Sequence, residues 1–124
     1  MISLMRHIPR SFSEVKNGSW EPGPYRGNEV SGKVLGIIGC GRLGSKVAKV
    51  SVALGMEVIS YDPYIKRFPA GVESKETLKQ VLELSDILSL HVPLSDENIH
   101  LISEKEISSM KDGVVIINTA RGEV

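Results

Sequence analysis

Hydrophobic residues follow two spacings along the chain, and the two alternate. Short apolar runs typical of strands cover 34–39, 57–62, 86–92 and 114–118, with a shorter candidate at 71–73. The run at 34–39 is apolar almost throughout, which is typical of a strand buried on both faces. Between these runs, the apolar residues recur at helical spacing. The pattern therefore predicts strands separated by helices.

Helical spacing is clearest after the first strand. The helix predicted at about 43–54 ends at Gly55, and we expect its apolar stripe to face the core. That stripe consists of Leu43, Val47, Val50 and Leu54. A second amphipathic helix is predicted at 75–84, with three residues inward, namely Leu78, Val81 and Leu82.

The two ends of the chain carry weaker helix signals. Residues 2–17 predict a helix with an imperfect apolar face, a kink near Pro9 and an end at Gly18. The segment 19–33 is rich in turn residues and reads as a surface connection. Ser103 and Glu106 have the spacing of a capping box, which would open a short helix through residue 110.

Alternating strands and helices predict an α/β fold, a doubly wound parallel sheet of the Rossmann type with helices on both faces. The expected strand order is 3-2-1-4-5, with right-handed crossovers. Such a sheet would be incomplete, since a full one has a sixth strand beside the fifth. The fifth strand would then be an open apolar edge, and we expect the chain to associate with a second copy or to exchange elements with it.

A glycine-rich turn, G-C-G-R-L-G, joins the first strand to the next helix. Gly39 would allow the tight turn, and Gly41 would let backbone approach a pyrophosphate. Gly44 would let the helix pack close to the strand, while the helix start presents unpaired N–H groups to phosphates. The alternative is a structural turn with no ligand. The strands on both sides favour dinucleotide binding.

Asp62 lies 18 residues after Gly44, at the end of the second strand. A carboxylate there can bind both ribose hydroxyls and would repel a 2′-phosphate, which favours NAD over NADP. Arg42 and Lys66 are nearby in sequence, but Arg42 is inside the turn and better placed for the pyrophosphate.

Composition narrows the class of protein. The 124 residues suffice for one domain, with 41% hydrophobic residues and a formal net charge of zero. Neutrality gives no support to nucleic-acid binding, and no apolar run reaches the length of a membrane span. Cys40 is the only cysteine, which favours a cytoplasmic protein without disulfides and a filler role over a redox one. No signal peptide or metal site is expected.

Several strings together resemble the NAD-binding domain of the D-isomer-specific 2-hydroxy-acid dehydrogenases, over nearly the whole chain. They are R-H-I-P-R-S-F-S-E-V-K-N-G-S-W, G-I-I-G-C-G-R-L-G, Y-D-P, L-H-V-P-L, N-I-H-L-I and I-N-T-A-R-G. H-V-P-L with N-I-H-L-I is similar to D-lactate dehydrogenases. D-3-phosphoglycerate dehydrogenases and glyoxylate or hydroxypyruvate reductases remain close alternatives.

The resemblance implies roles for individual residues. The backbone of Arg42 and Leu43 would bind the pyrophosphate, and Asp62 the adenosine ribose. Further cofactor contacts are implied for Val92, Pro93, Asn98, Thr119 and Ala120. The first helix and the nucleotide domain would form a homodimer interface, with Trp20 either in it or covering its own core.

Arg121 is the implied catalytic residue. Its guanidinium would grip the carboxylate of a small 2-oxo acid and polarise the carbonyl that receives hydride. The alternative is that Arg121 is a solvated loop arginine. The position of Arg121 after a strand favours the functional interpretation. His7, His91 and His100 are not expected to be proton donors, and His91 is expected to be a packed strand-end residue.

Two features of the family pattern are missing from the chain. The family's proton donor is a histidine paired with a glutamate, both downstream of the arginine motif, and a substrate domain flanks this one. We therefore expect a partial dinucleotide-binding domain over 1–124, without a substrate domain, that binds NAD weakly and has negligible activity alone. The alternatives are a nucleotide-binding or oligomerisation module without catalysis, and a nucleotide-sensing regulator, for which no DNA-binding feature is visible.

Overall fold

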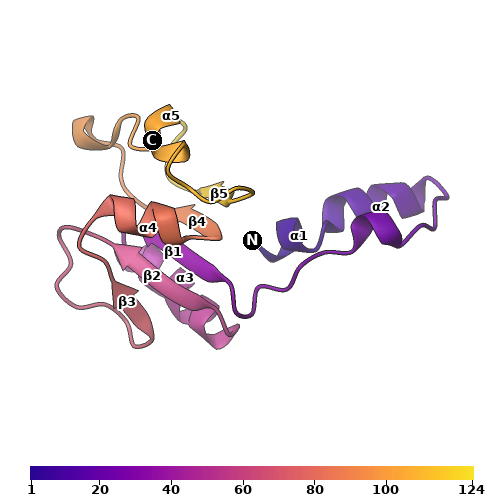
Figure 1. Cartoon of the computed structure of the whole chain (residues 1–124), viewed down its shortest axis with the longest axis horizontal. Helices are drawn as coiled ribbons and strands as arrows, with labels where there is room; N and C mark the ends of the chain where they lie inside the picture. Colours follow the sequence, from indigo (N-terminus) through magenta and orange to yellow (C-terminus); the bar gives the residue numbers. More distant parts are fainter. The chain divides into compact units, whose positions relative to one another are not determined.

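The computed structural model describes residues 1–124, which form two units, Met1–Val30 and Ser31–Val124. The first unit holds the short helices α1 (Ile2–Met5) and α2 (Ile8–Lys16), and a 3-10 turn at Gly23–Tyr25 (Figure 1). The prediction of one helix kinked at Pro9 is therefore wrong. The chain breaks earlier, at His7, whose φ is 51°, and Pro9 sits in the first turn of α2, where it needs no N–H partner.

The second unit is built on five parallel strands. These are β1 (Val34–Ile38), β2 (Glu57–Tyr61), β3 (Val72–Ser74), β4 (Ile87–Leu90) and β5 (Val115–Asn118) (Figure 1). Their order is β3-β2-β1-β4-β5, as predicted. β1 is central, and Gly36 in it is paired with Ile59 of β2 and Leu88 of β4. At the outer strand β5, Ile116 keeps 37% of its surface exposed.

Two longer helices cover opposite faces of this sheet. A Cβ on Gly36 would meet Val81 and Ser85, so that face of β1 lies under α4 (Leu78–Leu84). The next residue, Ile37, points the other way, and its Cγ2 lies 3.4 Å from where a Cβ on Gly44 of α3 (Arg42–Ala53) would be. Figure 1 shows α4 on the near face and α3 behind. The predicted doubly wound arrangement is confirmed.

The buried face of α3 differs from the prediction. Its buried residues are Gly44, Ala48 and Ser51, whereas Leu43 and Val50 keep 55% and 60% of their surface exposed. The small side chains let the helix axis approach the sheet, because a larger residue at Gly44 would collide with the backbone of β1's turn. Most of the predicted apolar stripe therefore faces outward, and only Val47 of it is half-buried.

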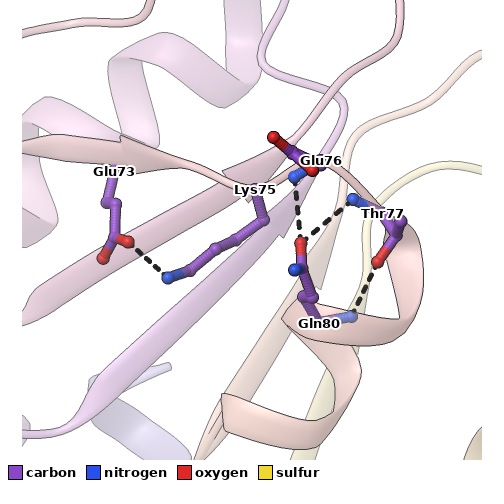
Figure 2. A network of polar contacts seen from close by, with 5 residues as sticks. All are labelled: Glu73, Lys75, Glu76, Thr77 and Gln80. Carbon is purple, nitrogen blue, oxygen red and sulfur yellow. Dashed lines mark hydrogen bonds and ion pairs between the residues drawn. The ribbon is translucent and has the colours of Figure 1, made fainter.

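The start of α4 is fixed by a capping box that the sequence analysis did not identify. The Gln80 side-chain oxygen accepts from the backbone N–H groups of Glu76 (3.0 Å) and Thr77 (3.2 Å). In return, Gln80 N–H donates to Thr77 Oγ1 at 3.3 Å, and Lys75 pairs with Glu73 alongside (Figure 2). These contacts satisfy N–H groups that a helix start leaves unpaired. Val81 and Leu82 are buried, as predicted.

The last helix, α5 (Glu104–Ile107), begins where the predicted capping box lies, with Glu106 accepting from the backbone N–H of Ser103 at 3.2 Å. It ends three residues earlier than predicted, at Ile107. No helix of the protein combines the length and the apolar character that crossing a membrane requires.

Candidate functional site

Residues singled out by sequence lie where four neighbouring parallel strands end, along one edge of the sheet. Direct contacts join these ends. Cys40, after β1, donates to Asp62, after β2, and Gly39 packs against Val92, after β4. Thr119, after β5, donates to Leu90 O at 2.9 Å. Ligands of parallel α/β sheets bind outside the carboxyl ends of the strands, so this edge is the candidate site.

The three glycines of the turn have different surroundings. Gly39 has a φ of +87°, and a Cβ on it would come within 2.8 Å of His91 O. A Cβ on Gly44 would lie 2.1 Å from Gly39 O. Gly41 has no protein atom within 4 Å of where a Cβ would be, so the space in front of it is open. Two glycines are thus required by the fold, and the third leaves room for another molecule.

The start of α3 faces the same edge. Gly41 is its N-cap residue and no side chain caps the helix. Arg42 and Leu43 are exposed in the first turn. A twelve-residue helix with an uncapped start offers N–H donors and the positive end of its dipole to an anion.

Asp62 faces this turn. Its Oδ2 accepts from Cys40 N–H at 2.8 Å, and its Oδ1 accepts from Tyr64 N–H at 2.9 Å. Both oxygens keep lone pairs, since a carboxylate can accept about four hydrogen bonds. The carboxylate is therefore held in place and can still accept from a ribose. Cys40 is 2% exposed, and its burial raises the pKa of the thiol, which agrees with a filler role.

A bridge between two loops was not foreseen from the sequence. Tyr64 Oη donates to Glu97 Oε2 at 2.9 Å, which links the loop after β2 to the loop after β4. Asn98 donates from Nδ2 to Pro93 O at 2.9 Å, so its amide holds the same loop together. No signal in the sequence pairs residues 33 positions apart.

The turn after β5 carries Arg121 and is held by Asn118, which was not among the predicted site residues. Asn118 Oδ1 accepts from Ala120 N–H at 2.9 Å, and its Nδ2 donates to Arg121 O at 2.7 Å. The exposed Arg121 guanidinium donates from Nη1 to Ala120 O at 2.9 Å. The side chain thus lies back on its own turn, with donors free for another group. An asparagine as the last residue of a predicted strand, followed by a turn, is the signal that identifies it.

A model of the D-isomer specific 2-hydroxyacid dehydrogenase NAD-binding domain matches residues 1–124. Among curated relatives, a hydroxypyruvate reductase of Thermotoga maritima is 44% identical over 98% of this chain and 40% of its own length. A D-3-phosphoglycerate dehydrogenase of Methanocaldococcus jannaschii is 39% identical over 98% of this chain and 24% of its own length. These two relatives are thus much longer than this chain.

Solved structures agree with the fold. The D-lactate dehydrogenase of Aquifex aeolicus, complexed with NAD and lactic acid, is 40% identical and covers 98% of this chain, with a TM-score of 0.89. This chain covers 37% of that structure. The apo D-lactate dehydrogenase of Escherichia coli is 34% identical over 99% of this chain, with a TM-score of 0.91. The chain belongs to the D-isomer specific 2-hydroxyacid dehydrogenase family and has the fold of that family's NAD-binding domain.

Proposed function

We propose that this chain binds NAD(H) along the edge formed by Gly39, Gly41, Asp62, Val92 and Thr119. The chain would be the nucleotide-binding part of a longer enzyme that interconverts a small 2-oxo acid and its D-2-hydroxy acid. The observation that carries the proposal is the open space at Gly41 in front of an uncapped helix start, with a carboxylate fixed beside it.

In this proposal the N–H groups of Arg42 and Leu43 bind the pyrophosphate, and Asp62 binds the adenosine ribose. Val92, Pro93 and Asn98 border the adenosine half, while Thr119 and Ala120 border the nicotinamide half. The nicotinamide, when bound, supplies or accepts the hydride. Support for the ribose assignment comes from the two backbone donors that already orient Asp62.

Arg121 has the catalytic role in the proposal. Its guanidinium presents a planar fork of donors that matches a carboxylate, and its charge would polarise the substrate carbonyl. The turn that carries it is fixed by Asn118, while the side chain is exposed. The second wall of the cleft and the proton donor would come from a substrate domain in the longer polypeptide.

We also propose that the enzyme is a homodimer. Supporting this, α3 exposes Leu43 and Val50, with the exposed Leu54 directly after its end, and α2 exposes Ile8, Phe12 and Val15. Large apolar side chains gathered on one helix face mark interaction surfaces. Light scattering is expected to give the mass of two chains, and a monomer at high concentration would contradict this.

A cytoplasmic location is proposed because the one cysteine is buried and has no partner.

Calorimetric titration of this chain with NADH and NADPH tests the nucleotide assignment. We expect heat with NADH and little with NADPH. Gly41→Ala should remove the NADH heat without lowering the melting temperature, because its Cβ meets only ligand space. Gly23→Ala is the matched control, since Gly23 also has open space but lies in the first unit. NADH binding unchanged in Gly41→Ala would contradict the proposed site.

A further inference from the structure

A chain of three hydrogen bonds joins the carboxyl ends of β4 and β5 through the His91 ring. Ser89 Oγ lies 2.9 Å from His91 Nε2, and Thr119 Oγ1 lies 2.9 Å from His91 Nδ1. Thr119 Oγ1 also lies 2.9 Å from the backbone oxygen of Leu90. The imidazole is therefore held at both nitrogens, by a hydroxyl on each side.

The bond from Thr119 to Leu90 determines which groups donate and which accept in the other two bonds. A carbonyl oxygen only accepts, so the single Thr119 hydroxyl proton goes to Leu90 O. Thr119 Oγ1 must then accept from His91, which places a proton on Nδ1. In the neutral ring Nε2 is left as an acceptor, and the Ser89 hydroxyl donates a hydrogen bond to it.

The surroundings favour this neutral ring. Ser89 is 4% exposed, and burial lowers the pKa of His91 below its ordinary value of 6.5. Protonation would add a hydrogen at Nε2 and turn the Ser89 hydroxyl, but Nδ1 would remain a donor to Thr119. The His91–Thr119 bond therefore persists in both charge states of the ring.

Thr119 directly follows β5 and begins the Arg121 turn. The turn is held on its own side by Asn118, which bonds Ala120 N–H and Arg121 O. Thr119 holds the turn on the side of β4. Its hydroxyl donates to Leu90 O and accepts from His91 Nδ1. Without the Nδ1 donor, the Thr119 hydroxyl would lose its second partner and could rotate.

We propose that His91 is a positioning residue for the Arg121 turn: its Nδ1–H holds the Thr119 hydroxyl on Leu90 O and so sets the place of the arginine. This rests on the proposed function of Arg121 in gripping a 2-oxo acid. The effect is expected on turnover, because small displacements of a catalytic group lower the rate more than they lower cofactor affinity.

The tautomer can be tested on this chain alone. Nitrogen-15 NMR of the histidine rings at a pH above 7.5 should show His91 with its proton on Nδ1, the less common form in solution. In Thr119→Val the ring loses its acceptor, and the Nδ1–H population should fall. A proton on Nε2 of His91 in the wild-type chain would overturn the proposal whatever the activity.

The second arm uses the longer enzyme, with His91→Phe and His91→Asn compared. Phenylalanine keeps a ring but has no donor, whereas the asparagine amide can place an N–H near the position of Nδ1. We expect His91→Phe to lower kcat about tenfold or more with the Kd for NADH nearly unchanged, and His91→Asn to retain a larger share of kcat. His7→Asn, at an exposed residue of the first unit, is the control.

The outcomes are distinct. A wild-type enzyme that binds NADH but turns over no 2-oxo acid would refute the proposed function. An active enzyme in which His91→Phe and His91→Asn lose kcat equally, or neither loses it, would refute the positioning role alone. Circular dichroism of each variant separates these results from a failure to fold, and the ring tautomer stands as a test if His91→Phe does not fold.

Discussion

Asp62 Oδ2 accepts a 2.8 Å hydrogen bond from the backbone N–H of Cys40, so the carboxylate after β2 is tied to the middle of the glycine turn after β1. Its other oxygen accepts from Tyr64 N–H at 2.9 Å. One side chain thus orders both the turn proposed to face a pyrophosphate and the start of the loop after β2. The structural role of Asp62 and its proposed role in ligand binding can be separated by mutation.

Asp62→Asn should separate the structural role of the residue from its role in cofactor binding. The amide oxygen can still accept from Cys40 N–H, but the amide nitrogen cannot accept from Tyr64 N–H, so we expect a smaller loss of stability than in Asp62→Ala. The charge that favours a ribose and repels a 2′-phosphate is lost. We expect NADH affinity to fall about tenfold, or about 1.4 kcal/mol, and the preference for NADH over NADPH to narrow. Calorimetry with both cofactors measures this.

Asp62→Ala is the companion variant. It removes the acceptor of two backbone N–H groups, which should cost about 1–3 kcal/mol of unfolding free energy in urea titrations. If Asp62→Asn bound NADH as tightly as the wild type and still rejected NADPH, the carboxylate would have no part in cofactor choice.

The glycine turn could be predicted because it is a local pattern, and the strand order because alternating strands and helices with right-handed crossovers leave few arrangements. It placed the wrong face of α3 inward, because Leu43 and Val50 have a regular apolar spacing while the buried residues, Gly44 and Ala48, are small. Burial there is decided by how closely the helix approaches β1, and hydropathy alone does not report that distance.

The contacts that support the site were the hardest to predict. The bond of Thr119 to His91 spans 28 positions, and that of Tyr64 to Glu97 spans 33. Each depends on which strands are neighbours and in which register, so it emerges only once the sheet is assembled. Sequence reasoning located the strand ends, but not the polar contacts that join them.

Gly36 in the middle of β1 tests how closely α4 approaches the sheet. A Cβ there would lie 2.0 Å from Ser85 Oγ and 2.7 Å from Val81 Cγ1, and both of these residues are fully buried. We expect Gly36→Ala to lower the free energy of unfolding by about 1–3 kcal/mol or more, because adding atoms to a well-packed core destabilises a protein by about this amount. Urea denaturation measures the loss.

Two variants accompany Gly36→Ala. Adding Ser85→Ala should recover part of the loss by removing the nearer atom, while Val81 still collides. Gly41→Ala is the matched control, because no atom lies within 4 Å of its Cβ position. Equal stabilities of Gly36→Ala and Gly41→Ala would show that α4 does not pack on β1 as described.

Asp86, at the start of β4, should make stability depend on pH. Burial alone would raise its pKa, but hydrogen bonds from Val34 N–H (2.8 Å) and Lys111 Nζ (2.9 Å) outweigh burial and hold the pKa below its ordinary value of 3.8. A carboxyl with a lowered pKa in the folded state stabilises the fold at higher pH. That contribution is lost as the pH falls through the folded-state pKa, below about 4.

We therefore expect Asp86→Ala to be less stable than the wild type by about 1–3 kcal/mol at pH 7, with the difference shrinking below pH 4. Asp86→Asn should lose less, since its amide oxygen can still accept from Val34 N–H. Urea titrations over a series of pH values measure both. A difference that stays constant from pH 7 to pH 3 would contradict the assignment.

Arg121→Lys tests the chemistry proposed for the turn after β5. Lysine keeps the positive charge but cannot form the planar two-point contact with a carboxylate. Because Asn118 bonds the backbone of the turn and not the arginine side chain, the turn should keep its shape in the variant. In the longer enzyme we expect kcat to fall by about 10²–10³, the range seen when one donor to a developing charge is removed.

The Kd of Arg121→Lys for NADH should change little. Arg67→Lys, at another exposed arginine, is the control and should leave both kcat and this Kd unchanged. Unchanged turnover in Arg121→Lys would dismiss the catalytic role, and an equal loss of NADH affinity and turnover would instead make Arg121 a cofactor-binding residue.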